Sequence, residues 1–300
     1  LSLHDALPIS GYGFILLEKI ILANYAIKKY DKALEFAEFS TNCFPSLTDI
    51  YFLKAMIYRD LNKPTLEIKA LKKCIELGEP PSELKFLYGT GSFKAFYDLG
   101  NVYAKHKDYE TAYKYFIETI RSKPDYLAPL YNIGHILKED KTPIEAFKSA
   151  IERFFDDFPN AYPIIADIFY SEGYYDVSLQ YIVKCEINAV TSDSLMLLKV
   201  KCLIRTKAFE ECIKMDTILK ESPFYFYFSM CQVISGILTN KFDYASSKIN
   251  SFKDITLSDY NKKMLQVYEQ LLKLFTKEST EILSEDKNEK EYKIGRAHVW

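Results

Sequence analysis

The stretch FKAFYDLGNVYAKHKDYETAYKYFIETIRSKPDY, residues 93–126, carries the clearest structural pattern of the chain. In its first half, one helical face is marked at the i, i+3, i+4 and i+7 spacing by Phe96, Leu99, Gly100 and Tyr103. The polar pair Lys107-Asp108 interrupts this spacing, which then resumes and ends before Pro124. The stretch therefore predicts two helices joined by a short turn.

Small residues mark the point where these two helices should cross. Gly100 on the first helix and Ala112 on the second would let the backbones approach, with Phe116 filling the space beside them. The order of these residues resembles the tetratricopeptide repeat, a helix–turn–helix unit of about 34 residues. The resemblance implies an all-α, right-handed superhelical solenoid of antiparallel helix pairs, with about seven units and a capping helix.

The same frame can be laid along most of the chain. Within a solenoid spanning 11–275 we expect units at about 14–47, 48–81, 93–126, 127–158, 159–191, 192–222 and 224–255. An insertion at 82–92 precedes the third unit, and the capping helix should occupy 257–275. On the second helix of the fourth unit we expect Ile144, Ala146 and Ala150 to be the packed residues. The charged stretch 276–293 lacks periodicity and is interpreted as a linker or tail.

Both termini differ from the rest of the chain. LSLHDALPIS at 1–10 and IGRAHVW at 294–300 look like translated sequencing-adapter DNA, so we expect them to be foreign to the protein. The intervening residues are then expected to be a fragment of a longer, bacterial protein.

Composition indicates a well-buried helical protein. Hydrophobic residues make up 48% of the chain and the formal net charge is −2, which argues against disorder and against nucleic acid as a partner. The six cysteines form no CxxC pair, so we expect buried, reduced thiols in a cytoplasmic protein and no metal site. No cofactor is expected in this fragment.

An uncharged stretch at 223–240 raises the question of a membrane span. It is interrupted by Pro223, Ser229, Gln232 and Gly236, whereas a spanning helix needs about 20 predominantly apolar residues. We therefore expect the buried first helix of a repeat, and no membrane partner.

The run Gly89-Thr90-Gly91-Ser92 invites comparison with a phosphate-binding loop. It lacks the lysine spacing and the preceding strand that such a loop requires, so we interpret it as a turn in which Ser92 caps the next helix. No catalytic constellation appears elsewhere, and no catalytic residue is assigned. A catalytic activity of the fragment itself is a third alternative.

Candidate binding residues lie on the first helices, which by resemblance to the repeat family form a concave groove. They are Tyr97, Asp98, Asn101, Lys105, Tyr131, Asn132, His135, Lys138, Asp167 and Tyr170. A carboxamide both donates and accepts, so Asn101 and Asn132 could pair with a peptide backbone, and the tyrosines add contact area. The alternative is that these residues form ordinary solvated helix faces. Self-association is a further expected use of the array.

Tetratricopeptide domains that bind chaperone C-termini use a cationic clamp. Asn101 and Asn132 match two of its positions, but Tyr97 replaces the first lysine, and Asn160 and Ile164 replace the next basic residues. The departure argues against capture of a terminal carboxylate.

Residues 48–137 support a narrower resemblance. The segment CIELGEPPSE, followed by GTGSFKAF, resembles the C-terminal repeat region of bacterial GT-A-type glycosyltransferases. That resemblance implies a protein- or peptide-binding arm cut from an enzyme whose catalytic domain is missing here. The alternative is a stand-alone repeat scaffold or peptide-responsive regulator without enzymatic activity.

Overall fold

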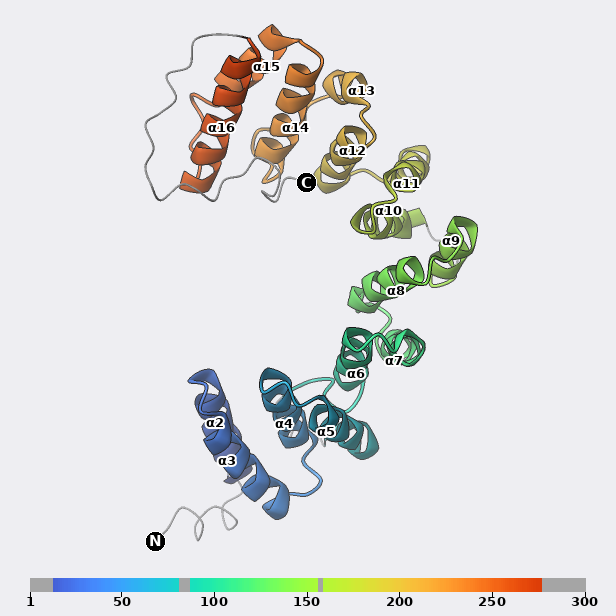
Figure 1. Cartoon of the computed structure of the whole chain (residues 1–300), viewed down its shortest axis with the longest axis vertical. Helices are drawn as coiled ribbons and strands as arrows, with labels where there is room; N and C mark the ends of the chain where they lie inside the picture. The colour runs from blue at the N-terminus through green and yellow to red at the C-terminus, as the bar shows by residue number, and fades with distance from the viewer. Residues whose placement is uncertain (1–12, 81–86, 156–158, 277–300) are drawn as a thin grey trace. The chain divides into compact units, whose positions relative to one another are not determined.

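The computed structural model describes residues 13–80, 87–155 and 159–276, and every regular element among them is a helix (Figure 1). The helices follow one another in pairs joined by short turns, which confirms the all-α class expected from the sequence. The ends expected to be foreign, 1–10 and 294–300, lie outside the described residues, as do 277–293 of the expected tail.

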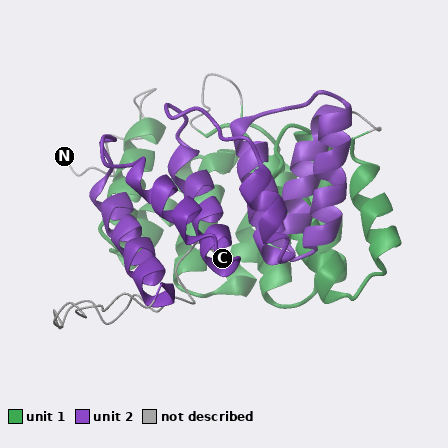
Figure 2. Ribbon diagram, turned by 90° about the horizontal axis from the view of Figure 1, so that it is seen from above, with its two compact units in different colours: residues 1–156 green, residues 157–300 purple. Residues whose placement is uncertain are grey.

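The chain divides into two compact units, coloured separately in Figure 2. In the unit formed by residues 1–156 the described helices are α2 (Gly13–Ala26), α3 (Tyr30–Cys43), α4 (Thr48–Asp60), α5 (Pro64–Leu77), α6 (Phe93–Lys105), α7 (Tyr109–Ser122), α8 (Ala128–Glu139) and α9 (Ile144–Glu152). In the unit formed by residues 157–300 they are the short 3₁₀ helix η2 (Pro159–Ala161), α10 (Tyr162–Ser171), α11 (Tyr175–Ile187), α12 (Asp193–Arg205), α13 (Phe209–Lys214), α14 (Tyr225–Leu238), α15 (Phe242–Asn250) and α16 (Asp259–Phe275).

The quoted stretch forms the pair α6–α7, and its helices cross at Gly100. A Cβ atom on Gly100 would lie 2.5 Å from Cε1 of Phe116, which is fully buried. Asp108 caps the second helix: its carboxylate accepts a hydrogen bond of 3.2 Å from the backbone N–H of Thr111. The crossing residue and the turn therefore act as the sequence predicts.

The turns inside the pairs share a left-handed residue. Between the two helices of a pair the backbone passes through positive φ at Lys28, Asn62, Lys107, Lys141, Gly173, Lys207 and Asn240. Only Gly173 adopts this conformation without a steric penalty on Cβ.

The fourth pair packs differently from the expectation. Phe147 and Ile151 are fully buried, whereas Ala146 is exposed and Ala150 only half-buried, so the expected packing of these two alanines is wrong. The turn 140–143 between α8 and α9 is one residue longer than the turn 106–108 between α6 and α7. The extra residue rotates α9 by about 100° and brings the following residues into the core.

The uncharged stretch forms α14, in which Ser229, Gln232 and Gly236 are buried together with the apolar residues around them. Among the described residues no helix is both long and apolar enough to cross a membrane. The burial of α14 against α12, α15 and α16 explains its composition.

Candidate functional site

The candidate residues of the first unit lie on α6 and α8. Each helical residue advances by about 100°, so Tyr97, Asn101 and Lys105 share one side of α6, opposite the packed residues Leu99 and Tyr103. Tyr97 and Asn101 are half-buried and Lys105 is exposed. This side of the first helices is called the groove wall below.

Asn101 and Asn132 are joined across neighbouring helix pairs. Nδ2 of Asn132 donates a hydrogen bond of 3.0 Å to Oδ1 of Asn101. The Nδ2 donor of Asn101 and the Oδ1 acceptor of Asn132 have no partner among the described residues. The structure thus brings together the two amides that the sequence singled out.

Asp98 differs from its expected role as an exposed groove residue, because it is 9% exposed. Nη2 of Arg59, from the preceding pair, lies 2.6 Å from Oδ2 of Asp98, while Nε of Arg59 lies 2.7 Å from Oε1 of Glu67. Burial raises the pKa of Asp98 and of Glu67, and the Arg59 guanidinium opposes both shifts. Arg59 therefore ties α4, α5 and α6 together, and Asp98 serves this network.

Sequence reasoning missed Arg59 and Glu67, although a signal was available. The first residue of α5 lies 16 positions after the first residue of α4, and the same spacing separates the starts of α6 and α7. Glu67 therefore occupies the place that Ala112 occupies in the next pair. A carboxylate at this buried place requires a cation, and Arg59 at the end of α4 supplies it.

A small cavity of about 130 Å³ adjoins Asn101. Lys105 of α6 lines it together with Asn62 and with His106, which directly follows α6. Nζ of Lys105 donates a hydrogen bond of 3.4 Å to Oδ1 of Asn62. The cavity provides a polar recess beside the asparagine pair.

The aromatic residues of the groove wall are held by other rings. The ring centroid of Tyr97 lies 5.9 Å from that of Phe116 and 5.2 Å from that of Tyr126. On α8, Tyr131 is half-buried, and His135 and Lys138 are exposed; all three interact with other residues of the chain.

The remaining candidates, Asp167 and Tyr170, lie on α10 in the second unit. Both are half-buried, and Asp167 interacts with other residues. The ring centroid of Tyr170 lies 5.4 Å from that of Tyr175. Burial raises the pKa of Tyr170, against the opposing effect of Arg205, so its hydroxyl stays protonated at neutral pH.

The glycine turn before α6 is occupied by the chain itself. The carboxylate of Glu79 accepts hydrogen bonds from the N–H groups of Gly89 and Gly91, at 3.2 and 3.1 Å, and from the Ser92 hydroxyl at 2.7 Å. Ser92 therefore precedes α6 without capping it through its side chain, in contrast to the expectation. These N–H groups bind a carboxylate of the chain in place of a phosphate.

Within the described ranges no group of three or more His, Cys, Asp or Glu side chains is arranged to hold a metal ion.

Residues 48–77 and 93–126 match the sequence profile of the tetratricopeptide repeat. No curated protein gives a significant match. Among solved structures, Pseudomonas aeruginosa pilF is 16% identical, with 88% of this chain and 97% of that chain covered and a TM-score of 0.40. A tetratricopeptide-repeat protein of Cytophaga hutchinsonii, represented by its C-terminal part, is 11% identical, with 89% and 96% covered and a TM-score of 0.46. The TPR2AB domain of yeast Sti1, solved as a complex with pHSP90, is 14% identical, with 89% and 100% covered and a TM-score of 0.38.

Proposed function

We propose that this chain is a binding arm that holds an extended peptide segment of a partner protein on the groove wall of α6 and α8. The observation that carries the proposal is the bonded pair Asn101–Asn132. Its free donor and free acceptor match the carbonyl and the N–H of a peptide backbone, which alternate along an extended chain.

The surroundings support a peptide as the ligand. Tyr97 and Tyr131 are half-buried beside the asparagines and offer apolar ring surface together with a polar hydroxyl. Tyr97 is restrained by Phe116 and Tyr126, so little side-chain freedom is lost when a ligand packs on it.

The experiment selects peptides on the purified chain from a displayed random library and measures their affinity by fluorescence anisotropy. We expect the double variant Asn101→Ala/Asn132→Ala to weaken binding by about tenfold or more, since it removes two backbone hydrogen bonds in a partly buried setting. The melting temperature should change little, because the groove wall is not part of the core.

The matched control is Asn42→Ala, which removes an exposed asparagine from the second helix α3. It should leave peptide affinity unchanged. Equal affinities of the double variant and the unmodified chain would place the site elsewhere. Sedimentation analysis tests self-association as a competing use: a dimer that the same double variant dissociates would show that the wall binds a second copy.

We further propose that the arm belongs to a bacterial glycosyltransferase and presents the acceptor. Support comes from the resemblance over residues 48–137, within which Glu79 of the second unit accepts hydrogen bonds from Gly89 and Ser92 at the end of the insertion. Sequencing the source DNA upstream of codon 11 tests this idea. An upstream GT-A domain with an Asp-x-Asp motif is expected, and an unrelated domain there would refute it.

A cytoplasmic location is part of the same proposal. The six cysteines are free thiols, and five of them are buried. Buried reduced thiols suit a compartment in which disulfides do not persist. Fractionation of the source cells measures the location.

A further inference from the structure

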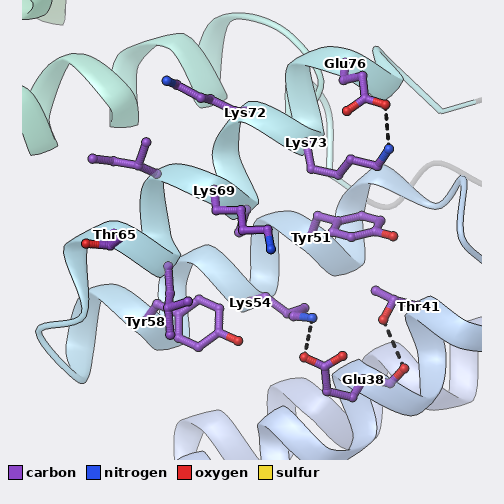
Figure 3. Close-up of a pocket in the computed structure, with 13 residues that line it drawn as sticks. Glu38, Thr41, Tyr51, Lys54, Tyr58, Thr65, Lys69, Lys72, Lys73 and Glu76 are labelled. Atoms are coloured by element: carbon purple, nitrogen blue, oxygen red, sulfur yellow. Dashed lines mark hydrogen bonds and ion pairs between the residues drawn. The ribbon is translucent and has the colours of Figure 1, made fainter.

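A cleft of about 830 Å³ opens in the first unit between α3 and α5, and α4 forms its floor (Figure 3). Its lining includes four lysines, Lys54, Lys69, Lys72 and Lys73, and two glutamates, Glu38 and Glu76. Cations therefore outnumber carboxylates in this cleft, although the chain as a whole has a net charge of −2.

The cleft is separate from the groove wall. Tyr51, Lys54 and Tyr58 contribute the floor, and they share one side of α4. α4 and α6 are equally long, and these three residues occupy the places of Phe96, Leu99 and Tyr103 in α6. That side faces away from the groove wall, so a ligand of the cleft and a peptide on the groove wall would not compete.

Lys54 is an unusual residue for its place. It directly precedes the small residue Ala55, and the residues in the same relation to Gly100, Gly134 and Ala166 are Leu99, Ile133 and Ile165. Those three side chains are fully buried, and the Lys54 side chain is only 11% exposed. A lysine side chain buried to this extent gives up part of the hydration of its ammonium group, a cost that leucine or isoleucine does not have. Packing alone therefore does not explain a lysine here.

The ion pairs around Lys54 leave positive charge available. Nζ of Lys54 lies 2.6 Å from Oε1 of Glu38, whose side chain is 57% exposed. Such an exposed carboxylate is weakly held and can give way to another one. Lys73 pairs with Glu76 at 2.6 Å, whereas Lys69 and Lys72 form no ion pair with a described residue. In Figure 3 Lys69 extends toward Tyr51 and Lys54, while Lys72 extends away from them.

Two tyrosines add hydrogen-bond donors and apolar surface. The hydroxyl of Tyr58 has no partner among the described residues, and burial, followed by the charge of Glu38, raises its pKa, so it remains a donor at neutral pH. Nζ of Lys54 lies 5.9 Å from the ring centroid of Tyr51, so the ring flanks the buried cation.

We propose that this cleft binds a glutamate- or aspartate-rich segment of a partner protein, with one carboxylate held between Lys54 on the floor and Lys69 on α5. Ammonium groups and the Tyr58 hydroxyl match carboxylate oxygens in charge and in hydrogen bonding. The two glutamates of the cleft and the net negative charge of the chain oppose the continuous phosphate backbone of a nucleic acid. The tyrosine rings pack against the methylene groups of acidic side chains.

The test measures binding of a fluorescein-labelled oligoglutamate peptide to the full chain by anisotropy, with oligoglutamine as the neutral probe. Lys54→Met should lower the affinity for oligoglutamate about tenfold or more, because it removes the buried charge-assisted contact. The melting temperature of this variant should stay equal or rise, since an apolar side chain replaces a desolvated cation. Lys69→Gln should lower the affinity about two- to fivefold and leave the melting temperature unchanged.

The matched control is Lys114→Gln, because Lys114 occupies in α7 the place that Lys69 occupies in α5, and it is exposed. It should bind oligoglutamate as the unmodified chain does, and so should Asn101→Ala/Asn132→Ala. Equal affinity for oligoglutamate and oligoglutamine, equal losses in the Lys69 and Lys114 variants, or preferential binding of a single-stranded oligonucleotide would each overturn the proposal.

Discussion

The crossing of α6 and α7 leads to a prediction in which a stability effect changes sign. In Gly100→Ala the new methyl carbon would lie 2.5, 2.7 and 2.9 Å from three ring atoms of Phe116. Ordinary contacts between carbon atoms are about 3.5–4 Å long, so the buried ring must retreat by about 1 Å. Tyr97 packs against the same ring and limits this movement.

Two opposing effects set the size of the change. Overpacking a filled core costs about 1–3 kcal/mol, and alanine in place of glycine favours a helix by about 0.5–1 kcal/mol. We expect a net destabilisation of about 1 kcal/mol, which corresponds to a fall of about 2–4 °C in melting temperature for a unit of this size. The larger side chain of Gly100→Leu should destabilise further.

The second pair of the chain shows how the clash is relieved. Ala55 and Leu71 occupy there the places of Gly100 and Phe116, and both are fully buried. In a Phe116→Leu background, Gly100→Ala should therefore become neutral or stabilising by up to about 1 kcal/mol.

Thermal unfolding of the four chains of this mutant cycle, followed by circular dichroism, measures the effect. Hydrogen exchange of α6 and α7 assigns the transition to the correct unit. A rise in stability for Gly100→Ala alone, or the same loss in both backgrounds, would refute the close approach of Gly100 to Phe116.

Three further predictions concern charge, thiol chemistry and the turns. Because burial raises the pKa of Asp98, the folded state binds protons more readily than the unfolded state, and the contribution of Asp98 to stability falls as pH rises through the window between the ordinary and the raised pKa. Asp98→Asn should remove this part of the pH dependence, which melting curves recorded from about pH 4 to about pH 7 measure, and an unchanged profile would contradict the burial of the carboxylate. Five of the six cysteines are buried, and burial raises the pKa of one of them, Cys231, to about 12. A colorimetric thiol reagent should therefore react quickly with Cys43 alone in the native chain, and fast reaction of several thiols would contradict the packing. Lys107→Gly should stabilise the chain by up to about 1 kcal/mol because Lys107 has a φ of 61°, whereas Gly173→Ala, at a φ of 83°, should destabilise it by about 1 kcal/mol. Chemical denaturation measures both changes in the free energy of unfolding, and changes of the same sign would argue against left-handed turns.

Much of the architecture could be predicted because helix pairs repeat with a regular apolar spacing. The quoted stretch follows this spacing closely, and its helices form as expected. α14 is expected from its lack of charge, and its residues are buried on almost every side. The packing of α9 could not be predicted, since a single extra residue in the preceding turn changes which side chains face inward without changing the composition.

The candidate site shows the same limit more sharply. The pairing of Asn101 with Asn132 follows from the repeat spacing, which places equivalent residues of neighbouring pairs side by side. The burial of Asp98 depends on Arg59, which reaches across from another pair, and a periodic pattern within one helix does not reveal such a partner. Whether the groove residues bind a peptide stays a prediction.

The matched sizes at the helix crossings also bear on how arrays of this kind can be rebuilt. Gly100 with Phe116 and Ala55 with Leu71 are two solutions of one volume constraint, and each is complete within its own pair. A chimaera that joined α4 to α7 would set Ala55 against Phe116 and inherit a collision, and one that joined α6 to α5 would leave a void beside Leu71. Duplication or grafting of whole pairs avoids both defects. The smallest unit of this chain that can be duplicated or exchanged is therefore the helix pair and not the single helix.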